Sequence, residues 1–283
     1  MKHYTTNKFL DGFVFLEGPR WHDNVLWVSD MMAHKVYRIS EAGETQVIAT
    51  VPERPSGLGF MPDGTPLIVS MLDRRVYKLV DGKLVLHTDA SATVNGDLND
   101  MVVDAEGRAY VGNFGYDIFG GGDPASAEII LVQTDGTHRI VADDLECPNG
   151  TIISADGQTL VVAESFAGRL TAFDRSPDGS LSNRRVYAEF DGLVPDGMCL
   201  DVEGNIWVAL FADKKFAQVD PNGQVIATID VAPNSAIACQ LGGANGRSLY
   251  CLVYAGDIDD IAQGKPNARI ETATVDSQAA GSP

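Results

Sequence analysis

The sequence predicts an all-β fold, a six-bladed β-propeller with four antiparallel strands in each blade. The first observation is a repeat, in which an apolar strand, a tight turn and a second apolar strand recur six times. Its turns are marked by Asn24, Gly64, Gly107, Gly157, Gly204 and Gly246, which are 40, 43, 50, 47 and 42 residues apart. The second observation is that further short apolar stretches follow most hairpins. Four short strands in a period of about 40–50 residues are typical of a propeller blade.

Each hairpin carries a recognisable turn signal. The six segments are GPRWHDNVLWVSD, GLGFMPDGTPLIVS, DMVVDAEGRAYVGN, GTIISADGQTLVVAES, GMCLDVEGNIWVAL and ACQLGGANGRSLYCLV. Their DN, DG, EG and NG dipeptides favour positive φ and predict two-residue hairpin turns. KVYRIS and RVYKLV are typical third strands, and TQVIAT and RRVYAEF are typical fourth strands.

Ring closure needs a strand from one terminus to complete the blade formed by the other, because an open ring leaves exposed strand edges. Residues 9–15 (FLDGFVF) and 268–276 (ARIETATVD) are the natural pair for this closure. We therefore expect one domain over residues 1–283, with a disordered polar tail over about 276–283.

The composition limits the classes of function. Thirty-nine acidic and 21 basic residues give a net charge of −18, which disfavours binding to nucleic acid. No stretch approaches the ~20 apolar residues that span a membrane, and the N-terminus lacks the apolar core of a signal peptide. The four cysteines of the chain show no CxxC spacing, and the sequence leaves open whether Cys239 and Cys251 form a disulfide. We expect a cytoplasmic protein without nucleic-acid or membrane partners, either a monomer or a small homo-oligomer.

The repeat places one residue at the opening of each innermost strand. These residues are Glu17, Ser56, Asn99, Asn149, Asp196 and Ile237. Equivalent positions in a radial repeat point toward the same axis, so the four of them that carry a carboxylate or carboxamide should converge at one end of the channel.

Glu17, Asn99, Asn149 and Asp196 would together form an all-oxygen cage with two negative charges. A single Asn or Asp before a strand is most often a turn or cap residue. Four such residues at one repeat position favour a metal site, because facing buried carboxylates are costly without a cation. Calcium suits hard oxygen ligands best. Magnesium and manganese fit the same ligand type, and zinc stays open although it prefers imidazole or thiolate.

At these residues the sequence resembles the senescence marker protein (regucalcin)/gluconolactonase/luciferin-regenerating-enzyme family of six-bladed propellers. The resemblance rests on LEGPRW with Glu17, LND with Asn99 and Asp100, CPNG with Asn149, and PDG with Asp196. It implies that Glu17, Asn149 and Asp196 hold a divalent metal, while Asn99 either joins them or contacts substrate. It also implies hydrolysis of sugar-acid lactones or related esters. The similar diisopropyl fluorophosphatase group cleaves P–F bonds with the same four-residue cage.

One position departs from the family pattern. Members that act on sugar-acid lactones often carry an arginine two residues before the first asparagine, and this chain has Asp97 there. A carboxylate cannot supply the hydrogen-bond donors of a guanidinium. The lactonase class of reaction is retained, whereas the sugar assignment is weakened.

The loops after the second strand of each blade should surround the cage. The candidate substrate-binding residues on these loops are His34, Met71, Phe114, Tyr116, Phe166 and Phe211. The same loops also bring Met31, Met32, Phe119 and Tyr254 to the entrance. An apolar rim above a polar floor is typical of a small-ligand pocket. The alternative for about half of them is packing between blades.

We expect a metal-assisted hydrolase that opens a lactone or related ester. The metal polarises the carbonyl oxygen, and Asp196 or Asp100 activates the attacking water as general base. Asp196 could instead act as a nucleophile, and Asp100 could serve only to orient Asn99. Two other readings stay open: a phosphotriesterase-like hydrolase, and a calcium-dependent binding or regulatory propeller without turnover.

Overall fold

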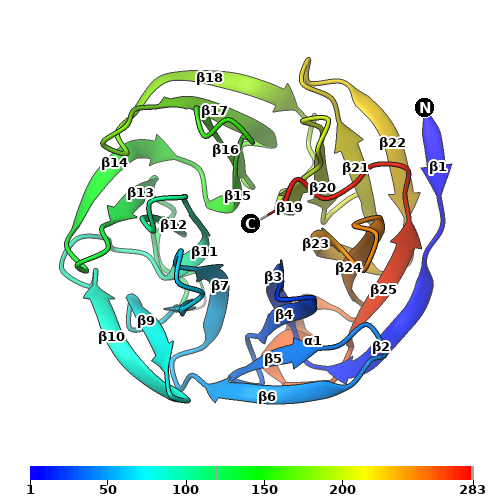
Figure 1. The fold of residues 1–283 in the computed structure, drawn as a ribbon, viewed down its shortest axis with the longest axis horizontal. Coiled ribbons are helices and arrows are strands. Elements are labelled where there is room, and N and C mark those ends of the chain that lie inside the picture. Colours follow the sequence, from blue (N-terminus) through cyan, green and yellow to red (C-terminus); the bar gives the residue numbers. More distant parts are fainter. Residues whose placement is uncertain (119, 282–283) are drawn as a thin grey trace.

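The computed structural model describes residues 1–118 and 120–281, and these residues form six sheets of at least four strands arranged in a ring (Figure 1). The predicted six-bladed β-propeller is therefore confirmed. Phe119 and the last two residues of the predicted tail lie outside the described residues.

Each blade is named by its strands, from the channel outward. The innermost strands are β3 (Leu16–His22), β7 (Pro55–Phe60), β11 (Leu98–Val103), β15 (Pro148–Ile153), β19 (Pro195–Leu200) and β23 (Ser235–Gly242), which open blades 1 to 6. The second strands are β4 (Val25–Asp30), β8 (Pro66–Ser70), β12 (Ala109–Asn113), β16 (Thr159–Glu164), β20 (Ile206–Leu210) and β24 (Ser248–Tyr254). The third strands are β5 (Lys35–Ile39), β9 (Arg75–Val80), β13 (Ala127–Val132), β17 (Arg169–Arg175), β21 (Lys215–Val219) and β25 (Ala268–Thr274). The outermost strands are β6 (Thr45–Thr50), β10 (Lys83–Asp89), β14 (His138–Leu145), β18 (Leu181–Glu189), β22 (Val225–Asp230) and β2 (Asn7–Phe13).

The N-terminal segment closes the ring, as predicted. Strand β2 pairs antiparallel with β25, with Asn7 opposite Thr272 and Phe13 opposite Ala268, and so forms the outer strand of blade 6. A preceding strand, β1 (Lys2–Tyr4), pairs in parallel with β22 and gives blade 5 a fifth strand at the edge of the ring (Figure 1). No repeat signal in the sequence predicts this strand. The short helix α1 (Ile258–Ala262) lies between β24 and β25.

The hairpin turns differ from the prediction in five blades. Only the first hairpin is a two-residue turn, in which Asp23 and Asn24 both have positive φ. In blade 3 the N–H of Asp104 donates to Arg108 O, so the loop between them consists of the three residues 105–107. Gly107, the last of the three, has positive φ. A glycine in this conformation ends a three-residue turn as readily as a two-residue one, so the dipeptide alone does not fix the loop length.

The inner strands are buried on both faces, since each packs between the inner strands of the two neighbouring blades, as β11 does between β7 and β15. Every residue of β7 and β11 is buried. All four cysteines are buried free thiols. Cys239 and Cys251 are direct partners in the β23–β24 register, which answers the question of their pairing for this structure: they face each other unbonded.

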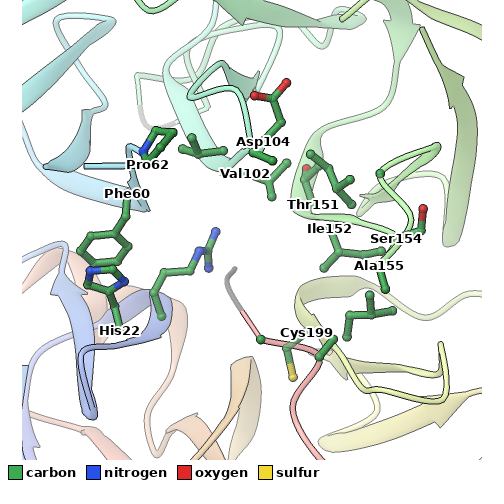
Figure 2. Close-up of a pocket in the computed structure, with 18 of the residues that line it drawn as sticks. His22, Phe60, Pro62, Val102, Asp104, Thr151, Ile152, Ser154, Ala155 and Cys199 are labelled. Atoms are coloured by element: carbon green, nitrogen blue, oxygen red, sulfur yellow. The ribbon is translucent and has the colours of Figure 1, made fainter. Parts of the chain in front are cut away.

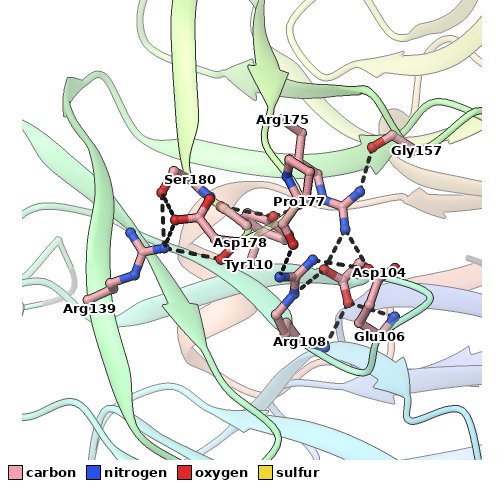
Figure 3. Close-up of polar contacts among 11 residues, drawn as sticks. Asp104, Glu106, Arg108, Tyr110, Arg139, Gly157, Arg175, Pro177, Asp178 and Ser180 are labelled. Atoms are coloured by element: carbon pink, nitrogen blue, oxygen red, sulfur yellow. Dashed lines mark hydrogen bonds and ion pairs between the residues drawn. The ribbon is translucent and has the colours of Figure 1, made fainter.

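A buried ion network joins blades 3 and 4 on the hairpin side (Figure 3). Arg175 at the end of β17 donates from Nη2 to Asp104 Oδ2 over 2.6 Å, and from Nε to the hydroxyl of Tyr110 over 2.9 Å. Arg108 bonds the same Asp104 oxygen over 2.7 Å and reaches Pro177 O in blade 4. These contacts join the β11–β12 hairpin of blade 3 to the end of β17 and the turn after it in blade 4.

The C-terminal tail differs from the expected disorder over its described part. Ala279 forms a bridge with Asp201, and Val202 donates its N–H to Gln278 O over 2.9 Å. Ser277 is buried and receives a hydrogen bond from Gln218 Nε2. Small polar residues were read as a sign of disorder, yet their backbone groups bond the loop that joins β19 to β20.

Candidate metal centre

The four predicted ligands occupy equivalent places in their blades. Glu17, Asn99, Asn149 and Asp196 are each the second residue of an innermost strand, namely β3, β11, β15 and β19. All four are buried, with between 3% and 9% of their surface exposed. Blades 2 and 6 supply Ser56 and Ile237 at this level, also buried. We call these six residues the ligand ring.

Close approach of the inner strands brings the ring together. In blades 1, 2, 4 and 5 the residue after the ring position is a glycine, and a Cβ there would collide with the next inner strand. A Cβ at Gly18 would lie 2.6 Å from Ser56 O, and one at Gly150 would lie 2.6 Å from Asp196 O. Glycine thus permits the contact that lets side chains from different blades meet near the axis.

The two asparagines are oriented by their nitrogen atoms. Asn99 Nδ2 donates to Pro148 O over 3.2 Å, and Asn149 Nδ2 to Ser165 Oγ over 3.3 Å. Ser165 Oγ in turn donates to Pro195 O in blade 5 over 2.8 Å. Each amide nitrogen therefore donates to another protein group, and the side-chain carbonyl oxygen remains available to a ligand.

Two oxygens of the ring are buried without a hydrogen-bond partner among the described residues: Asn149 Oδ1 and Asp196 Oδ1. A buried polar atom without a partner is destabilising, and such atoms are rare in folded proteins. Both are hard oxygen donors, as are Glu17 and Asn99, so the residues present fit a divalent cation such as calcium.

The carboxyl groups of the ring strongly affect each other. Burial, followed by the nearby charges of Asp196 and Asp100, raises the pKa of Glu17 well above its usual range. Burial and the charge of Asp100 raise the pKa of Asp196 to about 8, against hydrogen bonds from Asn149 and Gly197. A bound cation would reverse this effect by favouring the ionised forms.

Within the described residues, no three His, Cys, Asp or Glu side chains gather in a metal-binding geometry. The predicted cage is of another type, because it consists of two carboxylates and two carboxamides. The metal assignment therefore stays a prediction that depends on the asparagine oxygens as much as on the carboxylates.

Asp100 is adjacent to the ring and bound to a residue that the sequence analysis missed. Arg20, on β3, donates from Nη2 to Asp100 Oδ1 over 2.8 Å and also to Met101 O. Burial raises the pKa of Asp100, and Arg20 opposes that rise. The signal was present in the sequence: Arg20 is three residues after Glu17, where the same position in blades 3 to 5 carries Val102, Ile152 and Cys199.

The structure separates the six predicted substrate-binding residues. Phe166 is exposed to 49%, while Phe114, Tyr116 and Phe211 are partly buried near the same end of the blades. Met71 is only 1% exposed and packs in the main apolar cluster, which matches the packing alternative expected for about half of the loop residues. The Met71 N–H donates to Arg54 O, and the Met71 carbonyl oxygen accepts from the Leu98 N–H. These bonds hold the residue against the start of β11 in the next blade.

His34 contacts the segment that follows the outermost strand of blade 1. Its φ is +58°, and its ring Nδ1 is 3.3 Å from Val51 O. The turn between the second and third strands lies farther from the axis than the opening of the innermost strand, and the substrate-binding role of His34 stays a prediction.

A cavity of about 810 Å³ lies at the opposite end of the inner strands (Figure 2). It is lined by hairpin residues that include His22 and Asp104, by Val102, Ile152 and Cys199 on the strands, and by Ala280 of the tail. Arg20 also lines it while bonding Asp100, so this arginine lies between the cavity and the ligand ring. The cavity is the hairpin end of the channel and contains none of the four predicted ligands.

Among the described residues, none of the helices has the length and apolar character needed to cross a bilayer.

Comparison with known proteins places the chain in a family. Regucalcin from Danio rerio is 29% identical over 269 residues, which cover 89% of this chain and 87% of that protein. The pentonolactonase XacC from Haloferax volcanii is 28% identical over 263 residues, covering 87% and 84%. The solved luciferin-regenerating enzyme is similar in fold, with a TM-score of 0.85 and 20% identity, over 98% of this chain and 97% of the other. The model of the SMP-30/gluconolactonase/LRE-like region matches residues 15–254, and the chain belongs to this family.

Proposed function

We propose that the protein is a divalent-metal-dependent hydrolase that opens lactones or related esters at the ligand ring. One observation carries the proposal: two buried oxygens, Asn149 Oδ1 and Asp196 Oδ1, have no hydrogen-bond partner among the described residues. Family membership adds support, since a relative over most of the chain is named a pentonolactonase.

The ring would hold the cation through Glu17, Asn99, Asn149 and Asp196, and this all-oxygen set suits calcium. A bound divalent cation supplies Lewis-acid polarisation of the lactone carbonyl. Four protein ligands are fewer than the six to eight that calcium takes, which leaves positions for water and substrate.

Two carboxylates are candidates for the proton transfer. Asp100 is held by Arg20 Nη2, and its charge acts on both Glu17 and Asp196. Its interaction with both ring carboxylates supports a role as the acceptor of a proton from the attacking water. Asp196 is the other candidate, either as general base or as a nucleophile that attacks the carbonyl carbon and is released by water.

The test is hydrolysis of aliphatic, aromatic and sugar-acid lactones after chelation, with calcium, magnesium, manganese and zinc restored separately. We expect restored turnover in the wild type, and a loss of roughly 100-fold or more in kcat/KM for Glu17→Gln and Asp196→Asn. Asp135→Asn, on an exposed hairpin, is the control and should behave as the wild type. Turnover that survives both chelation and the two ring substitutions would overturn the proposal. If a bound metal supports no lactone turnover, a fluorophosphate substrate or a binding role replaces it.

A further inference from the structure

A second ring of residues lies just outside the ligand ring, two positions earlier in the chain. We call it the mouth ring; its members are Phe15, Arg54, Asp97, Cys147, Val194 and Ser235. In five blades the same backbone hydrogen bond fixes this position, at 2.9–3.1 Å: Met31 to Phe15, Met71 to Arg54, Phe114 to Asp97, Ser165 to Cys147, and Phe211 to Val194, each from N–H to C=O. The five members are therefore structurally equivalent.

The mouth ring borders the predicted cage. Residues two apart in an extended chain point to the same side, so these side chains follow those of the ligand ring. Ser165 links the two rings: its N–H donates to Cys147 O over 3.1 Å, and its Oγ accepts from Asn149 Nδ2 over 3.3 Å. A substrate whose carbonyl reached the ligand ring would carry its substituents past the mouth ring.

Charge is confined to one sector of this ring. Arg54 and Asp97, from neighbouring blades 2 and 3, are its only charged members. Asp97 is 8% exposed, and its Oδ2 atom is buried without a hydrogen-bond partner among the described residues. Burial and the charge of Asp117 raise the pKa of Asp97, while the charges of Arg74 and Arg54 lower it.

The rest of the mouth ring is apolar or small. Phe15 packs on Tyr254 with ring centroids 5.4 Å apart, and Cys147 and Val194 occupy the positions in blades 4 and 5. Beside these two lie Phe166, which is 49% exposed, and Phe211. This sector offers few partners for hydroxyl groups, whereas the Asp97 sector offers an acceptor that lacks a donor.

Building on the proposed lactonase function, we propose that Asp97 determines substrate choice. It accepts a hydrogen bond from one donor, a hydroxyl or an amide N–H, next to the lactone ring of a substrate whose remainder is apolar. A donor at this place satisfies the buried Oδ2 atom, and an analogue without it leaves that atom unpaired. A polyhydroxylated lactone would instead place several hydroxyls against the apolar sector without partners.

The test compares three δ-lactones under metal-restored conditions: one with an aryl chain and a single ring hydroxyl, its methyl ether, and glucono-δ-lactone. We expect the wild type to prefer the hydroxyl compound over the ether by about tenfold in kcat/KM, and over gluconolactone as well. In Asp97→Ala the hydroxyl-to-ether ratio should fall to within about twofold of one. Asp97→Asn keeps an acceptor oxygen and should retain part of the preference. Asp135→Asn is the matched control and should keep the wild-type ratio.

The outcomes separate this inference from the proposed function. Turnover with an unchanged ratio in Asp97→Ala, or a wild-type preference for gluconolactone, overturns the inference and leaves the hydrolase intact. Absence of turnover for all three lactones with every metal overturns the proposed function and the inference together.

Discussion

Arg20 reaches from blade 1 to blade 3 and donates from Nη2 to Asp100 Oδ1 over 2.8 Å, with both side chains almost fully buried. The same nitrogen also bonds Met101 O. The guanidinium thus crosses the channel between the ligand ring and the hairpin-end cavity. It compensates one of the three carboxylates whose charges act on one another there.

The Arg20–Asp100 pair should be strongly coupled. Removing one partner of a buried ion pair leaves an unpaired buried charge, so we expect Arg20→Met to cost about 3 kcal/mol of unfolding free energy. A double-mutant cycle with Asp100→Asn, measured by urea unfolding in the presence of calcium, should give a coupling of about 2 kcal/mol. Additive single effects would show that the pair contributes little.

Stability without metal should fall as pH rises. Burial and neighbouring carboxylates raise the pKa of Glu17 well above its usual range and that of Asp196 to about 8. Groups with a higher pKa when folded bind more protons in the folded state, so stability decreases from the unfolded pKa of about 4 toward pH 8.

Thermal unfolding of the chelated protein between pH 5 and pH 8 checks this prediction. We expect a decrease that Asp196→Asn reduces by about 1–2 kcal/mol and that saturating calcium largely removes. If the chelated wild type shows the same pH dependence of stability as Asp196→Asn, the Asp196 carboxyl group is not a source of that dependence.

The network between blades 3 and 4 should stabilise the fold without affecting catalysis. Arg175→Met removes the bonds to Asp104, Tyr110 and Glu106, and we expect a loss of about 3 kcal/mol. The control is Arg139→Met, whose surface pair with Asp178 is exposed at 43% and 67% and should contribute about 0.5 kcal/mol. Equal losses in urea unfolding would argue against a special role for the buried network. Lactone turnover of both folded variants should match the wild type, because the network lies at the hairpin end.

The sequence was sufficient for the architecture because the repeat is local. Each blade has its own turn signal and apolar strands. The segments that form β2 and β25 could be recognised as terminal strands that lack a partner in any complete blade and therefore pair with each other. The openings of the innermost strands could be aligned for the same reason, which identified Glu17, Asn99, Asn149 and Asp196 as equivalent positions.

Contacts between blades could not be read in this way. Arg20 meets Asp100 across 80 residues, and Met71 is drawn into the core by backbone bonds to Arg54 and Leu98. His34 lies in a loop of the correct type but at a radius set by the tight turn after β4. Such outcomes depend on side-chain length and on the distance from the axis, and the repeat pattern specifies neither.

The most direct test of the metal centre is calorimetric titration of calcium into the chelated protein. We expect one site per chain in the wild type and in Asp135→Asn. Glu17→Gln and Asp196→Asn should each lower the affinity by at least about tenfold, because each removes a charged ligand. Wild-type calcium affinity in both ring variants would contradict the account, since the cation would then be bound elsewhere.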